Sequence, residues 1–260
     1  MSLPLPVVVA RLRAAGCVFA EDEAELLVRS APTPAAVSAM VERRAAGMPL
    51  EQVLGWAEFC GLRIALEPGV FVPRRRSEFL VERAIALVRN APTPAVVVDL
   101  CCGSGAVGAA VAAALHRSRL YAVDIDPAAV RCAEQNLASQ HAQVYVGDLY
   151  QPLPATLRAQ ADLLVVNAPY VPTDELPLLP AEARLHEPQA ALDGGVDGLD
   201  LVRRIVAGAP AWLRRGGHLL IETGQHQAAE TARAIAAAGL LAQVLRSEDR
   251  DATVVAGTAR

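Results

Sequence analysis

The chain has 260 residues, 53% of them hydrophobic, and a formal net charge of −4. This length is enough for one large domain or two modest ones with a buried core. The apolar runs at 96–98, 163–166 and 219–221 are strand-sized and far shorter than the roughly 20 residues of a membrane span. No basic segment precedes an apolar stretch at the N-terminus, so we expect no signal peptide and a soluble cytoplasmic protein.

The charges and cysteines argue against two further classes of site. All 24 basic residues are arginines, and the 28 acidic residues outnumber them. Non-specific binding to nucleic acid needs several cations facing phosphates, so this balance disfavours a nucleic-acid partner. The five cysteines form no Cys-x-x-Cys pair and no Cys/His cluster. We therefore expect neither a metal site nor a disulfide framework.

The N-terminal part is predicted to be helical. Apolar residues such as Val8 and Leu12 recur there at helical spacing, which is typical of amphipathic helices. From residue 62 to residue 72, short apolar runs broken at Pro68-Gly69 predict a hairpin. The expected organisation is a helical domain at 1–59, a hairpin linker at 60–76 and a second domain at 77–260.

From about residue 95, apolar strands alternate with helices. This alternation predicts a mostly parallel sheet covered on both faces. A charged turn at 248–251 separates two last runs, which predict an antiparallel hairpin that closes the sheet. The expected strands are 95–100, 119–124, 143–146, 162–167, 218–222, 240–246 and 252–258, and the expected helices are 106–115, 127–137, 199–213 and 227–238.

A glycine-rich turn follows the first of these strands. Gly103 and Gly105 stand between that strand and the next helix. Glycine lets a ligand approach the backbone closely, and ligands of open parallel sheets sit beyond the carboxyl ends of the strands. Asp124 ends the second strand and can accept two hydrogen bonds from ribose hydroxyls. Asp148, which precedes Leu149 at the end of the third, can accept one from an adenine amino group.

Two cofactor classes compete for this turn. Gly103, Gly105 and Gly108 match G-x-G-x-x-G, which is also a dinucleotide-binding pattern. In dinucleotide folds, however, the glycines follow the strand directly and meet a pyrophosphate. Here two cysteines intervene, and Asp99 ends the strand. Its negative charge would repel a pyrophosphate and favour a sulfonium or an ammonium group, so we favour S-adenosylmethionine over a dinucleotide.

The fourth strand ends in Asn167, Ala168, Pro169 and Tyr170. Because Pro169 restricts the residue before it to extended geometry, the Ala168 carbonyl is held in a narrow range of directions. A planar NH₂ group has two donors, which Asn167 Oδ1 and the Ala168 carbonyl can both accept. Tyr170 can stack on the face of the planar group. Methyl transfer to such a weak nucleophile would depend on in-line positioning and on desolvation of the sulfonium.

Together these residues resemble the release-factor glutamine N5-methyltransferase family over nearly the whole chain. The resemblance implies a Rossmann-like class I methyltransferase sheet preceded by a small helical domain that helps to recognise a protein. It also implies that Cys101, Leu149 and Asn167 belong to the cofactor site and that Arg74, Glu78, Glu187 and Pro188 bind substrate. The matching motifs are Asp99-x-x-x-Gly103-x-Gly105, Asp124, Asn167-x-Pro169-Tyr170, Pro73-Arg74-x-x-Ser77-Glu78, Glu187-Pro188 and Glu222-x-Gly224-x-x-Gln227.

Three departures from the family pattern bear on the site. Ala168 replaces the first proline of Asn-Pro-Pro-Tyr, and Cys101 replaces the first glycine of the turn. Arg75 and Arg76 replace a proline and a carboxylate near the expected substrate entrance. If these arginines face the acceptor channel, they favour an acidic or differently shaped partner; the alternative is that both are solvated.

The predicted activity is transfer of a methyl group from S-adenosylmethionine to a glutamine side chain of a release factor, yielding S-adenosylhomocysteine. We expect a monomer without a membrane partner. Two alternatives remain open: another amide-bearing peptide or small molecule, and the N6 amino group of adenine in nucleic acid. Adenine enzymes need a base-flipping surface and usually a basic target-recognition region, whereas this chain is acidic overall and we expect no extra domain.

Overall fold

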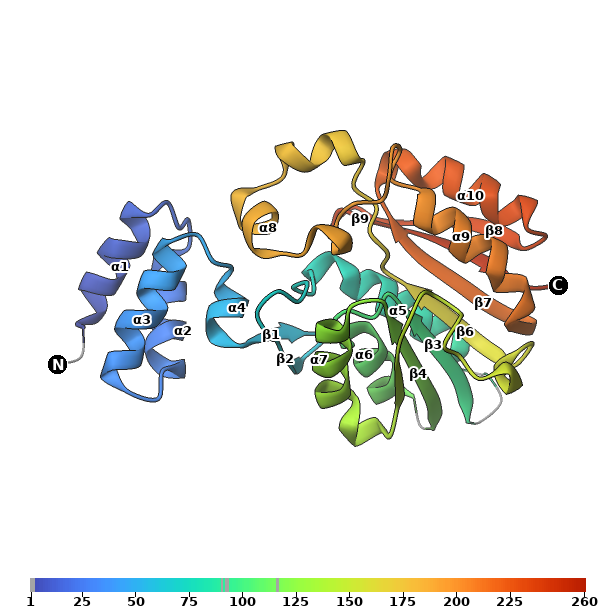
Figure 1. Ribbon diagram of the computed structural model, residues 1–260, viewed down its shortest axis with the longest axis horizontal. Helices are drawn as coiled ribbons and strands as arrows, with labels where there is room; N and C mark the ends of the chain where they lie inside the picture. The colour runs from blue at the N-terminus through green and yellow to red at the C-terminus, as the bar shows by residue number, and fades with distance from the viewer. Residues whose placement is uncertain (1–2, 90, 92–93, 116) are drawn as a thin grey trace.

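The computed structural model describes residues 3–89, 91, 94–115 and 117–260. At one end of the molecule, a group of helices packs around its own apolar core, which includes Val8, Leu12, Leu27 and Val41 (Figure 1). Thr33 begins the third helix by accepting a hydrogen bond from the Ala36 N–H, which satisfies a free donor of the first turn. The helical pattern expected here is confirmed. These helices are α1 Leu5–Ala14, α2 Ala20–Ser30, α3 Pro34–Ala45 and α4 Leu50–Leu54.

A two-stranded hairpin follows, formed by β1 (Trp56–Phe59) and β2 (Leu62–Ala65). The expected break at Pro68-Gly69 is therefore wrong. The turn lies at Cys60 and Gly61, which both have positive φ, of 50° and 72°, as a tight type I′ hairpin requires. Glycine adopts this conformation freely, whereas Cys60 needs support and donates its N–H to Glu78 Oε1 at 3.0 Å.

The larger unit contains a seven-stranded sheet in the order β5-β4-β3-β6-β7-β9-β8 (Figure 1). The first five strands of this order are parallel, and β9 runs antiparallel to both β7 and β8. The predicted sheet and its closing hairpin are confirmed. The strands are β3 Ala95–Leu100, β4 Ser118–Asp124, β5 Gln143–Val146, β6 Ala161–Val166, β7 Leu213–Thr223, β8 Leu241–Ser247 and β9 Ala252–Thr258.

Helices cover both faces of this sheet. Neighbouring residues of β3 point to opposite faces, so that Val97 joins the core under α5 to α7 and Val98 joins the core under α9 and α10. The predicted helix 199–213 is shorter than expected, because Pro210 cannot continue the hydrogen-bond ladder and a 3₁₀ turn replaces the last residues. The helices are α5 Glu78–Val88, α6 Ala106–Ala114, α7 Pro127–Leu137, α9 Asp200–Gly208 and α10 Ala228–Ala237.

The connection between β6 and α9 is long and arches over the carboxyl edge of the sheet (Figure 1). It contains a short helix, α8 (Ala181–His186), which is tied to the N-terminal helices. Arg44, a buried residue of α3, pairs with Glu182 at 2.5 Å and with Glu23 at 2.6 Å. Gln52 donates to the His186 carbonyl. Among the described residues, no helix has the length and apolar character needed to cross a membrane.

Candidate active site

A cavity of about 840 Å³ opens at the carboxyl ends of β3, β4, β5 and β6. It brings most of the predicted site residues together, whereas Gly105, Glu78 and Glu187 do not line it. The predicted residues that line it are Arg74, Asp99, Cys101, Gly103, Asp124, Asp148, Leu149, Asn167, Ala168, Pro169, Tyr170 and Pro188.

The two predicted glycines have different roles in the turn. Gly103 has a φ of +53°, and no atom lies within 4 Å of the place where its Cβ would be. A ligand can therefore lie directly against its backbone. Gly105 has a φ of +76° and sits against α7, where an added Cβ would be 3.1 Å from Ala133 and Leu137. Gly105 thus serves helix packing instead of contacting a ligand.

Cys101 occupies the first position of the turn with a φ of 56°. A residue with a Cβ is strained in this left-handed region. The backbone at this position therefore keeps the conformation that favours glycine, although the residue is a cysteine. Burial raises the pKa of the Cys101 thiol, and the neighbouring carboxylates Asp124 and Asp99 raise it further. The thiol is therefore neutral in the cavity wall.

The third glycine of the G-x-G-x-x-G match makes room for a carboxylate. Asp99 Oδ2 accepts a hydrogen bond from the Gly108 N–H at 2.8 Å, and a Cβ on Gly108 would be only 2.9 Å from that oxygen. Burial raises the pKa of Asp99 to about 7. The third glycine of the pattern is therefore needed here to leave space for the Asp99 carboxylate, and not to approach a pyrophosphate.

Two more acidic residues line the cavity at the ends of β4 and β5. Asp124 accepts backbone hydrogen bonds from Gly103 at 2.8 Å and from Asp126 at 3.0 Å, which fixes its side chain beside the turn. Asp148 pairs with Arg204 of α9 at 2.5 Å. Sequence reasoning did not identify Arg204, because its proximity to Asp148 arises only from the packing of α9 on the sheet.

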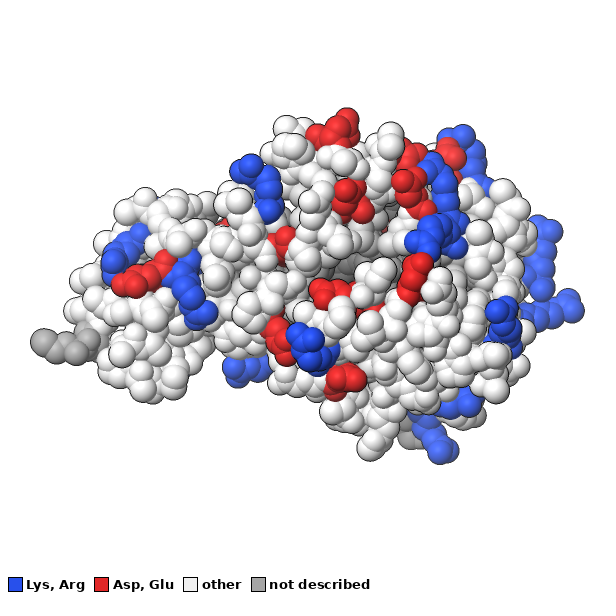
Figure 2. Space-filling model, in the orientation of Figure 1, with Lys and Arg blue, Asp and Glu red and all other residues white. Residues whose placement is uncertain are grey.

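The cavity has a predominantly acidic border. Figure 2 shows acidic side chains around a hollow in the middle of the face in view. The arginines that line the cavity are each paired with a carboxylate, whereas Asp99 and Asp124 have no ion pair among the described residues. Such a field attracts cations and repels phosphates. It therefore suits a sulfonium and an ammonium group better than a pyrophosphate or a nucleic acid.

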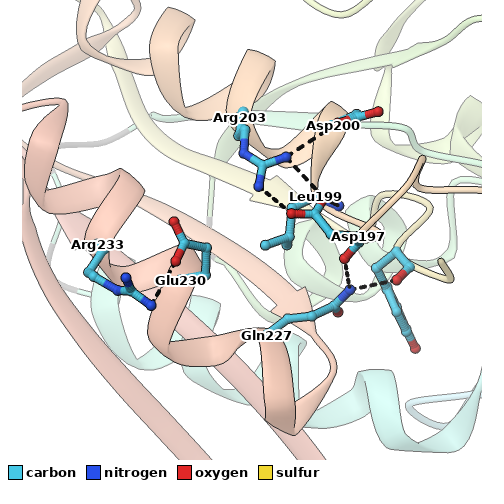
Figure 3. Close-up of polar contacts among 8 residues, drawn as sticks. Asp197, Leu199, Asp200, Arg203, Gln227, Glu230 and Arg233 are labelled. Carbon is cyan, nitrogen blue, oxygen red and sulfur yellow. Dashed lines mark hydrogen bonds and ion pairs between the residues drawn. The ribbon is translucent and has the colours of Figure 1, made fainter.

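The residues after β6 form the other end of the cavity. Asn167 donates through Nδ2 to Ser77 Oγ at 3.2 Å. Gln227 donates to the backbone carbonyls of Tyr170, at 2.8 Å, and Asp197, at 3.0 Å. Figure 3 shows Gln227 reaching from the start of α10 towards Asp197. Because Gly198 passes close to the Tyr170 carbonyl, where a Cβ would be 2.2 Å away, these contacts fix the backbone at Tyr170.

The four predicted substrate-binding residues are placed differently. Arg74 and Pro188 line the cavity. Glu187 is buried behind Arg74, which donates to both of its carboxylate oxygens, at 2.6 and 2.7 Å, so that Glu187 orients Arg74. Glu78 lies outside the cavity, where it accepts from Cys60 in the hairpin turn. The position of Glu78 therefore does not support a direct contact with a substrate in this cavity.

The two unusual arginines differ from each other. Arg76 lines the cavity, donates to the Tyr170 hydroxyl at 2.6 Å and lies 3.5 Å from Glu222 Oε1. Arg75 is exposed. The solvated alternative thus describes Arg75, whereas Arg76 faces the reactive end of the site.

Comparison with known proteins agrees with this geometry. The model of the methyltransferase small domain family matches residues 61–250. The chain belongs to this family. Over 196 residues it is 42% identical to a release factor glutamine methyltransferase of Geobacter sulfurreducens, covering 75% of this chain and 67% of that protein. A second enzyme of that name, from Mycolicibacterium smegmatis, is 38% identical over 88% of this chain and 81% of its own length.

One relative acts on a different acceptor by its name. The 4-amino-L-phenylalanine/4-methylamino-L-phenylalanine methyltransferase of Streptomyces pristinaespiralis is 34% identical over 88% of this chain and 78% of its own length. This similarity shows the shared family but does not identify the methyl acceptor, which depends on the residues at the reactive end of the cavity.

Three residues of this methyltransferase carry contacts at the reactive end to which sequence reasoning gave no role. They are Ser77, Glu222 and Gln227, and each stands in a motif that matches the family. The only signal in the sequence was therefore the motif itself. Their contacts with Asn167, Arg76 and Tyr170 depend on tertiary packing.

Proposed function

We propose that this methyltransferase transfers a methyl group from S-adenosylmethionine to the side-chain amide nitrogen N5 of a glutamine in a peptide chain release factor. The observation that carries the proposal is the single cavity that joins an acidic glycine turn to Asn167 and Tyr170. The names of the release factor glutamine methyltransferases to which the chain is similar support the same acceptor.

Cofactor binding is assigned to the glycine-turn end of the cavity. The open space in front of Gly103 fits a ligand against the backbone, and the unpaired carboxylates fit a cationic ligand. We assign Asp124 to the ribose hydroxyls, Asp148 with Leu149 to the adenine, and Asp99 to the cationic end of the cofactor through its charge. Cys101 and Gly103 form the wall against which the cofactor lies.

The acceptor amide is assigned to the other end. Asn167 Oδ1 and the Ala168 carbonyl accept the two N–H groups, and Tyr170 covers the planar face. The cofactor supplies an electrophilic methyl group: the nitrogen lone pair forms the new N–C bond, and the electrons of the broken C–S bond remain on sulfur. The methylated nitrogen then loses one proton to water. Positioning supplies most of the acceleration in such a step.

We further propose that the helical domain at 1–59 recognises the protein acceptor and that the enzyme acts as a monomer in the cytoplasm. The ion pair between Arg44 and Glu182 supports the first of these points. It connects the N-terminal helices to the segment that overhangs the cavity, so a protein bound by the helices would reach the acceptor site.

A second candidate acceptor is the aromatic amine of a small amino acid. One relative is named for that activity, and an aromatic amine also presents a planar, conjugated NH₂ group. Nucleic-acid adenine is disfavoured by the acidic border of the cavity.

The test is transfer from labelled S-adenosylmethionine to release factors, 4-aminophenylalanine, DNA and RNA in parallel. We expect labelling of the release factor, and mass spectrometry should locate the methyl group on a glutamine side chain. Labelling of the small amine alone would reject the protein acceptor.

A further inference from the structure

The orientation of the Asn167 side chain decides whether it can hold an acceptor NH₂ group. A primary amide has an acceptor oxygen at one end and a donor nitrogen at the other. With Oδ1 towards the methyl-accepting amide, Asn167 accepts one of its N–H groups. In the flipped orientation, the Asn167 NH₂ group would face the substrate NH₂ group, and no hydrogen bond could form between these two donors. Because the two ends have nearly the same shape, only hydrogen bonds from neighbouring residues can select one orientation.

Ser77 provides such a hydrogen bond. Its Oγ accepts from Asn167 Nδ2 at 3.2 Å, and Ser77 is only 1% exposed. Ser77 directly precedes α5 and has helical φ and ψ, of −68° and −10°, because the 3₁₀ turn Arg75–Ser77 leads into the helix; its side chain makes no capping hydrogen bond. The hydroxyl is therefore used for Asn167 instead of for the helix.

A hydroxyl that must accept from Asn167 is best oriented by a strong acceptor for its own hydrogen. Glu222, at the carboxyl end of β7, lies close enough to Ser77 for the Ser77 hydroxyl to lower its pKa. Neither of its carboxylate oxygens has a hydrogen-bond partner among the described residues, so both are free to accept the Ser77 hydrogen. Glu222 is 3% exposed, and a buried carboxylate is costly unless charges and donors compensate it. Burial raises the pKa of Glu222, while the Ser77 hydroxyl and the Arg76 guanidinium lower it.

Arg76 connects Ser77 and Glu222 to Tyr170. Its Nε lies 3.5 Å from Glu222 Oε1, and its Nη2 donates to the Tyr170 hydroxyl at 2.6 Å. The guanidinium thus balances the buried carboxylate and holds the ring that covers the acceptor.

We infer that Ser77, Glu222 and Arg76 are positioning residues of the acceptor site. Ser77 selects the Asn167 orientation that presents Oδ1, Glu222 directs the Ser77 hydrogen away from Asn167, and Arg76 fixes Glu222 and Tyr170. This inference rests on the proposed function, because it concerns the same acceptor.

The first test is Ser77→Ala in the full-length enzyme, with S-adenosylmethionine and a release factor as substrates. We expect kcat to fall about 10- to 100-fold, the scale of a misplaced reactant, with KM values and S-adenosylhomocysteine affinity within threefold. Ser77→Thr keeps the hydroxyl and should restore kcat. Thr231→Val is the matched control, since it removes a buried hydroxyl of α10 that has no hydrogen-bond partner among the described residues.

A Ser77→Ala variant with wild-type kcat would overturn the inference, as would one that loses cofactor affinity or melts much earlier, because a structural role would then explain it. Asn167→Ala, measured alongside, separates the two proposals. If that variant also retains wild-type activity, the proposed acceptor site itself is rejected; if only Ser77→Ala retains it, the positioning role alone fails.

Glu222→Gln and the double variant with Ser77→Ala test the order of the contacts. If Glu222 acts through Ser77, the double variant should be no slower than Ser77→Ala alone, since coupled residues are not additive. If the fold-losses in kcat of the two single variants multiply in the double variant, Glu222 does not act through Ser77.

The last arm compares two neighbouring arginines. Arg76→Gln should lower kcat several-fold, while Arg75→Gln, at a position that does not line the cavity, should leave it unchanged. A higher kcat/KM for the release factor in Arg76→Gln would overturn the positioning role of Arg76.

Discussion

At the scale of single residues, the backbone at Cys101 makes a clear prediction. Its φ of 56° costs an L residue about 1–2 kcal/mol, part of which glycine loses again through the entropy of the unfolded chain. Cys101→Gly should therefore stabilise the protein by up to about 1 kcal/mol in urea unfolding. Cys102→Gly is the matched control: Cys102 is buried in the core without a positive φ, so its loss should destabilise.

Asp124 is expected to act on cofactor affinity. It faces the cavity and is already held by two backbone donors, so its remaining lone pairs are fixed for ribose hydroxyls. Asp124→Ala should weaken S-adenosylhomocysteine binding by about 1.5–3 kcal/mol, the scale of hydrogen bonds to a charged group. Calorimetry measures this directly, and unchanged affinity would place the ribose elsewhere.

Asn167 is expected to act on turnover instead. It lines the same cavity after β6, whereas Asp124 ends β4, on the other side of β3. Asn167→Ala should lower kcat on a release factor by about 10²-fold or more, with cofactor affinity within a few fold. Single-turnover measurements with the cofactor pre-bound check this, and near wild-type turnover would mean that the acceptor nitrogen is held by other residues.

At the scale of elements, the contact between α3 and α8 depends on one buried arginine. Arg44→Ala leaves the buried Glu23 without its partner, which should cost about 3–5 kcal/mol. Glu182→Ala leaves the pair of Arg44 and Glu23 intact and removes only the half-exposed partner. It should change unfolding free energy by less than about 1 kcal/mol but raise KM for the release factor. Equal KM values would exclude a role of this tie in acceptor binding.

The sheet elements could be predicted because their apolar runs are long and uninterrupted, as in β3 and β6, which are buried throughout. The hairpin was misplaced because Cys60 is not a usual turn residue, and its positive φ depends on Glu78, 18 positions away. The carboxyl ends of the parallel strands located the site. Ser77 and Glu222 could not be given roles, because their contacts with Asn167 and Arg76 cross between elements far apart in the sequence.

At the scale of the whole molecule, the negative charge that lines the cavity predicts which cofactors cannot bind. Asp124 and the ionised fraction of Asp99 lie beside the turn without ion pairs among the described residues, so a dinucleotide pyrophosphate would meet uncompensated negative charge. NAD should show no binding in calorimetry under conditions where S-adenosylmethionine binds. Competitive binding of NAD at the same site would contradict this assignment of charge.

The contact between Asp99 and Gly108 also has a consequence for proton uptake. With a pKa of about 7, Asp99 is partly protonated at neutral pH, and a cation bound beside it lowers that pKa. Binding of S-adenosylmethionine should then release protons, and its affinity should rise as the pH increases through 7. The measured heat of binding should depend on the ionisation enthalpy of the buffer, less so for S-adenosylhomocysteine, which lacks the sulfonium charge. Asp99→Asn should remove this buffer dependence, so that the enzyme exchanges protons with solution through a residue that never contacts the acceptor.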